Sequence, residues 1–408
     1  MKDHYRIVLV ADTHIGAERS PKWRGLNITP EQYDRPFNEA LEWADLTDAD
    51  LTIVAGDLYH GRSPLPDDYR RAKTILNWVR GVGGRGRGKP NNTTYGSLIV
   101  AGNHDIGVAG DTDALWSELT VARGKPSVFT FGSPTNAIQV LTLPWPRPTD
   151  WPAASSESME GTILATGREV LHELNRQANE LNPDRPAILV GHAMVSKGVR
   201  HGAGVVREPM KGPGLMLGKD VVLKLSDLEA LPNIGGIYLG HVHDASIKPY
   251  IGSTQPTDWG DLGQKSFTVV DITWVDNAWA YETRQIPYAT SLKLWNMEVQ
   301  WDEELWTLDY ATLPPNPDGI RCTVKADPGV KVPVEWIREQ LARFGTVHSV
   351  NVEYPPTLVA RVESVDGQSL TALPESDMAD LWLDQAEIEH GDRRDRIMRE
   401  FERMRELV

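Results

Sequence analysis

The sequence contains one cysteine, Cys322, among its 408 residues. A single thiol excludes a disulfide within the chain and any zinc site built from several cysteines. It fits a reducing compartment, where structural disulfides are rare. Long apolar runs are also missing, since no stretch approaches the roughly 18 residues of a membrane span. We therefore expect no signal peptide, no membrane partner and a cytoplasmic location.

Positive charge is in deficit, with 42 Lys and Arg against 57 Asp and Glu and a net charge of −15. This balance argues against a protein that coats nucleic acid through bulk attraction to phosphate. However, carboxylates that ligate metal ions count as negative in this sum although bound ions neutralise them. Local basic patches also coexist with an acidic total, so net charge does not decide the substrate.

The first two-thirds of the chain alternates short apolar runs with helical patterns. Apolar runs of this length are typical of strands buried on both faces of a sheet. Their alternation with helices predicts a layered α/β domain. The strand-like runs are RIVLVA (6–11), LTIVAG (51–56), SLIVAG (97–102), AILVGH (187–192) and GGIYLGH (235–241), and the helical patterns cover 36–46, 68–80 and 168–181.

Three later runs, at 248–252, 266–275 and 278–286, have no helical pattern between them. We expect them to be antiparallel strands that complete the domain as a second sheet. After residue 290 the pattern changes again, and a strand-like run, a helical run and a second strand-like run predict a small α+β module. These three runs cover 320–327, 332–345 and 346–354.

Five polar motifs follow the strand-like runs directly. Loops at the carboxyl ends of strands converge on one edge of an α/β sheet, so we expect the motif residues to meet there. Carboxylate, imidazole and amide groups without thiolate suit hard or borderline divalent metals. A single motif of this kind would indicate a structural histidine or aspartate, but the five together predict a metal site. The candidate ligands are Asp12, His14, Asp57, Asn103, His192, His241 and His243.

The spacing suggests how these ligands are shared. Asp12 and His14 are two residues apart and would face the same side of a strand, so we expect them to bind one ion together. His241 and His243 are expected to face different ions. Asp57 is the natural bridge, because one carboxylate offers two oxygens to ions about 3.5–4 Å apart.

These motifs resemble the calcineurin-like metallophosphoesterase family. Four further stretches resemble its DNA-repair exonuclease branch, the SbcD-like nuclease subunits. They are DLYH (57–60), LPWP (143–146), ILVGHAMV (188–195) and YIGSTQPTDWGDLGQKSFTVVDI (250–272). The last stretch contains Asp258, Trp259 and Asp261, for which we expect a structural role.

The resemblance implies two manganese ions, although the donor groups also suit magnesium, iron or zinc. His104 would give a proton to the leaving alkoxide, a role that imidazole suits near neutral pH. Asp105 would orient His104 or else be a structural carboxylate. His60 would lie near the DNA or else be a surface-loop histidine. One ion would be held by Asp12, His14, Asp57 and His243, and the other by Asp57, Asn103, His192 and His241.

The implied activity is that of a manganese-dependent DNA exonuclease and endonuclease in DNA end processing, recombination or repair. The implied partners are DNA, an SMC-like ATPase subunit (SbcC-like) and a second copy of the chain in a homodimer. Two alternatives stay open. One is a stand-alone metallophosphodiesterase or phosphatase that acts on small substrates, and the other is a scaffold that keeps a relic of the site.

The predicted fold class is α/β: a two-sheet β-sandwich flanked by helices, a small α+β capping domain and a C-terminal helix. The predicted domains are 1–288 (catalytic), 289–365 (capping and DNA-binding) and 366–408 (partner docking). The segment 392–408 has an amphipathic helical pattern and would dock on a partner or on its own chain. The basic loop RGVGGRGRGK (80–89) would contact DNA or be a solvated connection.

Overall fold

The structure is a computed structural model. The basic loop at 80–89 and the predicted C-terminal domain, 366–408, lie outside the residues that it describes. None of the helices in the described part of the chain combines the length and the apolar character that a membrane crossing needs. The described residues are 2–79, 96–106, 120–133, 136–154, 156, 158–201, 204–209, 220–301, 316–327 and 330–354.

A six-stranded sheet carries the first motifs, with the strand order β13-β12-β1-β2-β3-β4. Strands β1 to β4 are parallel, whereas β12 pairs antiparallel with β1 and β13 antiparallel with β12. The expectation that these last two strands form a second sheet is therefore wrong, because they extend the first one. The strands are β1 (His4–Val10), β2 (Leu51–Ala55), β3 (Gly96–Val100), β4 (Val121–Ala122), β12 (Ser266–Val275) and β13 (Ala278–Pro287).

A second sheet has four strands in the order β11-β7-β6-β5, with β7 parallel to both β6 and β11. The predicted strand at 248–252 is absent, and Tyr250 makes only an isolated bridge to Leu239. Strand β6 was not predicted, because the buried polar residues Gln139 and Thr142 interrupt its apolar run. The strands are β5 (Ser127–Ser133), β6 (Asn136–Leu143), β7 (Ala187–His192) and β11 (Ile237–Gly240).

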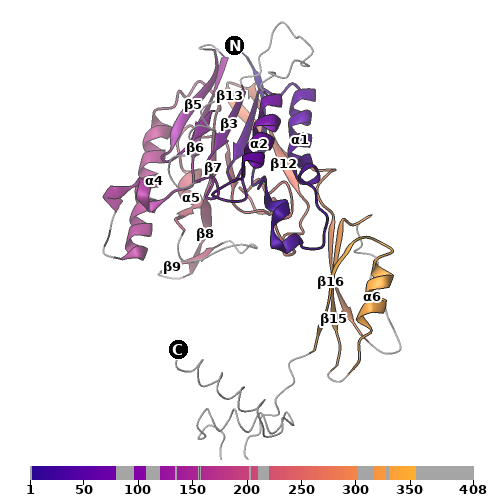
Figure 1. Cartoon of the computed structure of the whole chain (residues 1–408). Helices are drawn as coiled ribbons and strands as arrows, with labels where there is room; N and C mark the ends of the chain where they lie inside the picture. Colours follow the sequence, from indigo (N-terminus) through magenta and orange to yellow (C-terminus); the bar gives the residue numbers. More distant parts are fainter. Residues whose placement is uncertain are drawn as a thin grey trace, which may run out of the picture. The chain divides into compact units, whose positions relative to one another are not determined.

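The two sheets pack face to face with helices on both outer faces, which confirms the predicted α/β sandwich (Figure 1). The inner layer contains buried residues of both sheets, such as Leu9 and Val190. Helices α1 and α2 cover the six-stranded sheet, and α4 covers the four-stranded one. Their bounds are α1 (Pro30–Leu46), α2 (Pro66–Val79), α4 (Met159–Asn179) and α5 (Leu225–Glu229).

Helix α1 begins earlier than the predicted segment at 36–46. Thr29 caps it: its hydroxyl accepts the backbone N–H of Gln32, whose side chain accepts the backbone N–H of Thr29. Pro30 occupies the first helical position, where its missing N–H costs nothing. Pro36 therefore lies inside the helix and does not mark its start.

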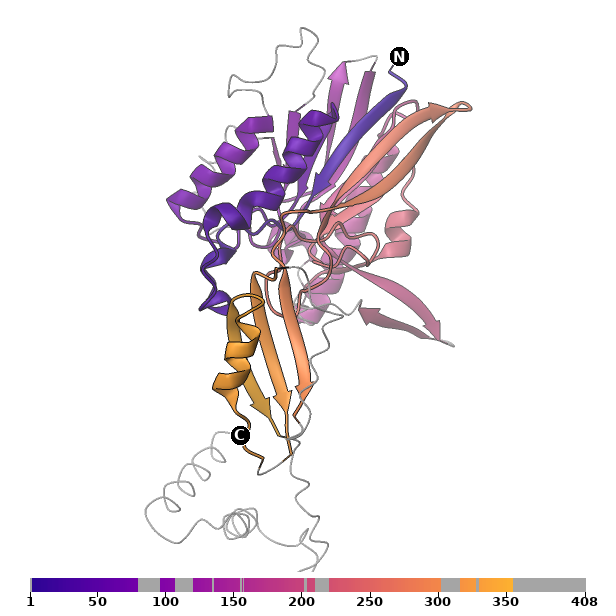
Figure 2. The ribbon, with the colours of Figure 1, turned by 90° about the vertical axis from the view of Figure 1, so that its right-hand side faces the viewer.

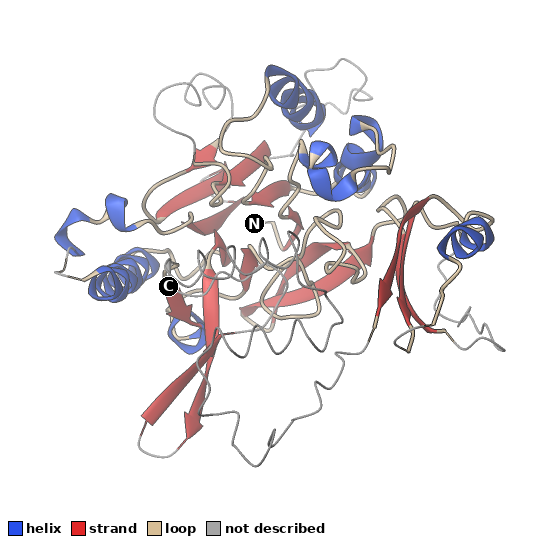
Figure 3. Cartoon of the chain, turned by 60° about the horizontal axis from the view of Figure 1, so that its bottom comes forward, coloured by secondary structure: helices blue, strands red, loops and turns tan. Residues whose placement is uncertain are grey.

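Two smaller sheets complete the described chain (Figure 3). One has the order β10-β8-β9 and the other β14-β15-β16. The second, with α6 beside it in Figure 2, is the predicted α+β module with one strand, β14, added. The bounds are β8 (Met194–His201), β9 (Gly204–Pro209), β10 (Val222–Lys224), β14 (Leu294–Gln300), β15 (Gly319–Lys325), β16 (Val347–Glu353) and α6 (Val334–Leu341), with short 3-10 turns η1 (Ala17–Arg19), η2 (Pro21–Trp23), η3 (Pro148–Asp150) and η4 (Pro152–Ala154).

The chain divides into two compact units, and the predicted domain bounds stay predictions. Every motif residue named above belongs to the first unit. The first comprises Met1–Met297, Asp309–Cys322 and Glu335–Val350, and the second comprises Glu298–Leu308, Thr323–Val334 and Asn351–Val408.

Candidate metal centre

The five motifs lie at the carboxyl ends of β1, β2, β3, β7 and β11, where their side chains meet. Four of the ligand residues have a left-handed backbone, which side chains other than glycine rarely adopt. Such strain persists where the surrounding structure holds it, often at functional sites. The residues are Asp12 (φ 51°), His14 (φ 45°), Asp57 (φ 50°) and His241 (φ 96°).

Because their backbone is left-handed, the expectation that Asp12 and His14 face the same side of a strand is wrong. They do not share a side by strand alternation, because they lie in a turn after β1. Backbone hydrogen bonds hold this turn against the next strand end, from Asp12 N to Gly56 O and from His14 N to Asp57 O, both 3.0 Å. The two side chains are nevertheless brought together by this turn.

The first group of donors contains Asp12, His14 and His243, whose ligand atoms all lie within 4.8 Å of one another. The ring Nε2 atoms of His14 and His243 are 3.1 Å apart. Asp57 is adjacent, with its Oδ2 3.9 Å from Nε2 of His14. These are the four residues that the resemblance assigned to one ion.

The second group of donors contains Asp12, Asp57 and His192. Oδ2 of Asp57 lies 3.5 Å from Nε2 of His192. The amide oxygen of Asn103 is 3.0 Å from the same Nε2 and 3.2 Å from Nδ1 of His241. Asp12 also reaches this side, because its two oxygens accept the backbone N–H of His241 at 3.0 Å. Asp12 and Asp57 therefore both lie between the groups.

Two glycines allow this close approach. A Cβ at Gly56, whose φ is +87°, would collide with the ring of His192. A Cβ at Gly102 would collide with the backbone nitrogen and the carboxylate of Asp57. At both positions a larger residue displaces a candidate ligand.

Burial and neighbouring charges shift the pKa values of the ligands in opposite directions. Burial lowers the pKa of His14 well below its ordinary value, and burial together with His192 lowers the pKa of His241 to about 3. Burial also opposes the charge on His192, but the carboxylates Asp57 and Asp12 outweigh it and raise the pKa of His192 to about 9. Asp57 is buried too, yet the surrounding imidazoles hold its pKa well below the ordinary range.

This donor set fits divalent metal ions. Metal ligands must be deprotonated, and the buried His14 and His241 are neutral imidazoles with ring nitrogens available. Two buried carboxylates supply the negative charge, while Asn103 adds an amide oxygen. Nitrogen and oxygen donors without sulfur suit manganese, magnesium, iron or zinc.

His104 and His60 lie beside the ligands. Nε2 of His104 is 4.0 Å from Oδ2 of Asp57. The ring of His60 stacks on that of His104 with centroids 5.9 Å apart, and its centroid is 5.5 Å from that of His14. The structure therefore brings His60 beside the candidate ligands, in the half-buried loop after β2, and its role near DNA stays a prediction.

Asp105 does not orient His104. Its carboxylate accepts the backbone N–H groups of Tyr59 at 3.2 Å and Gly102 at 2.9 Å, so it stabilises the turn that carries Asn103. Burial beside Asp57 raises the pKa of Asp105 to about 6. The group that faces Nδ1 of His104 is the backbone carbonyl of His60. The contacts of Asp105 match the alternative interpretation, a structural carboxylate.

Two further residues support the ligands: Trp145, for which no role was predicted, and Asp261, for which we predicted a structural role but not its contact. Trp145 packs against His241 and His192, with ring centroids 4.7 and 5.9 Å away. Asp261 accepts from Nδ1 of His243 at 3.2 Å. Both residues occur in stretches that carried the family resemblance, which was the available signal, but chain position alone does not reveal which ring each contacts.

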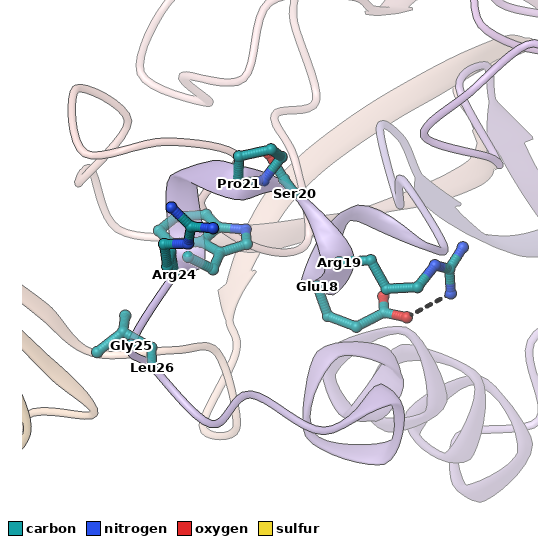
Figure 4. A pocket seen from close by; sticks show the side chains of 8 residues that line it. Glu18, Arg19, Ser20, Pro21, Arg24, Gly25 and Leu26 are labelled. Atoms are coloured by element: carbon teal, nitrogen blue, oxygen red, sulfur yellow. Dashed lines mark hydrogen bonds and ion pairs between the residues drawn. The ribbon is translucent and has the colours of Figure 1, made fainter.

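A cavity is lined by residues of the segment 18–26, which comes shortly after His14 in the sequence (Figure 4). Its Arg19 pairs with Glu18 at 2.8 Å and with Asp68 at 2.6 Å. The arginine charge is thus balanced within the protein, and we assign the cavity no ligand.

Three solved structures are among those to which the chain is similar. A putative 5'-nucleotidase from Staphylococcus aureus, solved with alpha-ketoglutarate, is 15% identical (TM-score 0.42), and the match covers 70% of this chain and 54% of that one. A dimetal phosphatase from Danio rerio is 12% identical (TM-score 0.37; 71% and 100% covered). The calcineurin-like phosphoesterase YfkN from Bacillus subtilis is 13% identical (TM-score 0.34; 71% and 92% covered).

This chain thus spans about half the length of the S. aureus protein. The search of curated proteins gave no match. The family model described as calcineurin-like phosphoesterase matches residues 5–245, which is more than half of the chain and contains all seven candidate ligands. The chain therefore belongs to the calcineurin-like phosphoesterase family.

Proposed function

We propose that the protein is a manganese-dependent DNA exonuclease and endonuclease of the SbcD-like type. It would hydrolyse phosphodiester bonds in DNA end processing, recombination or repair. One observation carries the hydrolytic part: the donors of five strand ends meet around Asp57, with Nε2 of His104 4.0 Å from its Oδ2. The DNA part is supported by the sequence stretches around the ligands, above all 57–60 and 250–272.

The ligands would divide between two ions that share Asp57. When bound, such ions neutralise the phosphate oxygens and lower the pKa of water near the phosphorus atom. His14 and His243 lie on one side of Asp57, Asn103, His192 and His241 lie on the other, and Asp12 lies near both groups. Ions held by these two groups of ligands would bind a phosphodiester in the orientation that in-line attack requires.

His104 supplies the proton for the leaving oxygen. The carbonyl of His60 faces Nδ1 of His104 and holds a proton there, so a second proton on Nε2 produces the imidazolium acid. Nε2 is the nitrogen that points toward Asp57, beside which the ions would hold the phosphate. Donation from Nε2 to the departing alkoxide is general acid catalysis.

His60 keeps this acid in place. Burial and the neighbouring His104 lower the pKa of His60, so its ring stays neutral at pH 7. A neutral ring stacked on His104 adds no repulsion to the imidazolium, and its backbone carbonyl anchors Nδ1. His60 therefore serves the proton transfer as well as lying beside the path of the DNA.

The partners we propose are an SMC-like ATPase subunit and a second copy of the chain, with the protein in the cytoplasm. The partners rest on the sequence resemblance, and the location rests on the single cysteine and the shortness of the apolar runs. A hydrolase of small phosphodiesters or phosphomonoesters is the second candidate, and the net charge of −15 favours it because an acidic protein attracts DNA weakly.

A paired assay separates the candidates. Wild-type protein with manganese is given linear duplex DNA in one reaction and bis(p-nitrophenyl) phosphate in the other. The proposal predicts loss of duplex DNA, and activity confined to the small diester contradicts the DNA assignment. A scaffold would show neither activity nor bound manganese in elemental analysis. Omission of the metal and addition of a chelator are the controls.

A further inference from the structure

The ring of His243 is hydrogen-bonded to the protein on the edge that points away from His14. Its Nδ1 lies 2.9 Å from the hydroxyl of Thr257 and 3.2 Å from Oδ2 of Asp261. Its Nε2 lies 3.1 Å from Nε2 of His14. One nitrogen is therefore engaged by the protein, and the other is presented to the candidate metal centre.

These contacts decide which nitrogen carries the hydrogen. An ionised carboxylate only accepts hydrogen bonds, so Nδ1 must be the donor to Asp261. The Thr257 hydroxyl accepts from the same N–H and turns its own hydrogen toward Oδ2 of Asp261, 3.5 Å away. With its hydrogen on Nδ1, a neutral His243 has its lone pair on Nε2, the form that binds a metal ion there.

Asp261 is itself fixed as an anion. The ammonium group of Lys265 pairs with Oδ1, and the backbone N–H of Thr257 donates to Oδ2 at 3.2 Å. Both Asp261 and Lys265 are 5% exposed, so this pair is shielded from water and from direct contact with a large substrate.

Lys265 also holds the backbone of the ligand. Its Nζ donates to the carbonyl of His243 at 3.2 Å. One buried ammonium thus links the main chain of His243 to the carboxylate that grips its ring. Removing one member of a buried ion pair leaves the other charge uncompensated, which is costly. His243, Asp261 and Lys265 therefore behave as a unit.

The loop between Thr257 and Lys265 is anchored at a second point. Trp259 is buried and donates Nε1 to the carbonyl of Lys22 at 3.3 Å. Its ring stacks on His348 with centroids 5.0 Å apart and contacts Trp23 at 6.2 Å. The loop therefore has little freedom to withdraw Asp261 from His243.

We propose that Asp261, held by Lys265 and assisted by Thr257, is the positioning residue that commits His243 to bind a divalent metal ion through Nε2. The inference rests on the two-metal site of the proposed function and is independent of the DNA substrate. Carboxylates behind histidine ligands typically contribute 10- to 100-fold in metal affinity. Asp261 would act on the ion through the ring of His243, which its carboxylate contacts.

Manganese titration, followed by the loss of the free-ion EPR signal, tests the proposal. Asp261→Asn is expected to weaken the ion on the His14 and His243 side by roughly 10- to 100-fold and to leave the second ion unchanged. Lys265→Met is expected to weaken the same ion. The matched control is Asp258→Asn in the same loop, because Asp258 pairs with Lys22 at 3.2 Å and is not among the contacts of His243. Thermal unfolding monitors whether each variant is folded.

A second readout needs no variant. Imidazole nitrogen NMR of the wild-type protein, loaded with diamagnetic magnesium, reports which nitrogen of His243 carries hydrogen. The proposal requires the hydrogen on Nδ1, and an Nε2–H form overturns it. In Asp261→Asn the carboxamide can donate to Nδ1, so an Nε2–H form is expected to appear.

The outcomes separate this inference from the proposed function. If the wild-type protein binds two ions and Asp261→Asn binds both with wild-type affinity, the positioning role is overturned and the proposed function stands. If the wild-type protein binds no manganese, the proposed function fails and this inference fails with it.

Discussion

His104 donates its backbone N–H to Oδ1 of Asp57 over 2.8 Å, while its ring Nε2 lies 4.0 Å from Oδ2 of the same carboxylate. The candidate acid is therefore attached to the candidate bridging ligand by its own main chain. This attachment depends on the backbone of residue 104, so it survives a change of side chain. Acid catalysis and metal binding can be tested separately for that reason.

The first prediction concerns His104→Ala. We expect the variant to retain manganese binding, because the backbone hydrogen bond to Asp57 stays, and to lose about 10²- to 10⁴-fold in kcat, the usual contribution of a general acid. Duplex DNA hydrolysis and manganese titration measure the two effects. His172→Ala, which removes an exposed histidine on α4, is the control. Full activity of His104→Ala would show that the proton comes from elsewhere.

The second prediction concerns Gly102→Ala. The added Cβ has no space beside the backbone nitrogen of Asp57, so either the turn or the carboxylate must move. We expect a loss of about 1–3 kcal/mol in the free energy of unfolding, typical of overpacking, and weaker manganese binding. Urea denaturation and metal titration measure these effects.

The matched control for this change is Gly61→Ala, because a Cβ at Gly61 meets no atom within 4 Å. It should have the stability and the metal affinity of the wild-type protein. Equal behaviour of the two alanine variants would mean that the close approach at Gly102 is unimportant.

The third prediction concerns acid stability. Burial alone would raise the pKa of Asp271, but hydrogen bonds from Arg6 at 2.7 Å and Arg284 at 2.6 Å lower it below its ordinary value. A depressed pKa in the folded state stabilises the protein above the pKa of the unfolded chain. That stabilisation disappears as the pH falls through the lower folded-state pKa.

Asp271→Asn should therefore reduce the free energy of unfolding at pH 7 by about 1.5–3 kcal/mol, the range for hydrogen bonds to charged groups. The difference between variant and wild type should shrink as the pH falls below 4. Urea denaturation across this pH range measures it. A difference that is constant with pH would indicate that the carboxylate charge plays no part.

The strands that carry the ligands were predictable because they are buried on both faces. Continuous apolar runs such as 6–11 and 51–56 are what such burial requires. Strand β6 escaped prediction because Gln139 is buried yet satisfied by the backbone at Asn182, which breaks the apolar pattern. The pairing of β12 with β1 depends on contacts between residues more than 250 positions apart, such as His4 with Thr273, and no local pattern specifies it.

The ligand set was predictable for a similar reason, since each candidate follows a recognisable strand. The local geometry of the ligands was not predictable. Asp12 and His14 meet through a left-handed turn fixed by hydrogen bonds to the neighbouring strand end, which strand alternation does not describe. Likewise, the spacing of Asp105 and His104 suggested a contact, whereas the carboxylate turns back to the backbone of Tyr59 and Gly102.

The most direct test of the account is the number of manganese ions bound per chain by the wild-type protein and by Asp57→Asn. An amide offers one oxygen where the bridging carboxylate offers two, so the variant cannot join both ions. The exposed Asp67→Asn is the control for the loss of one negative charge. Isothermal titration with elemental analysis should give two ions for the wild type and for Asp67→Asn, and at most one for Asp57→Asn. Fewer than two ions on the wild type, or two ions of unchanged affinity on Asp57→Asn, would contradict a two-metal centre built around Asp57.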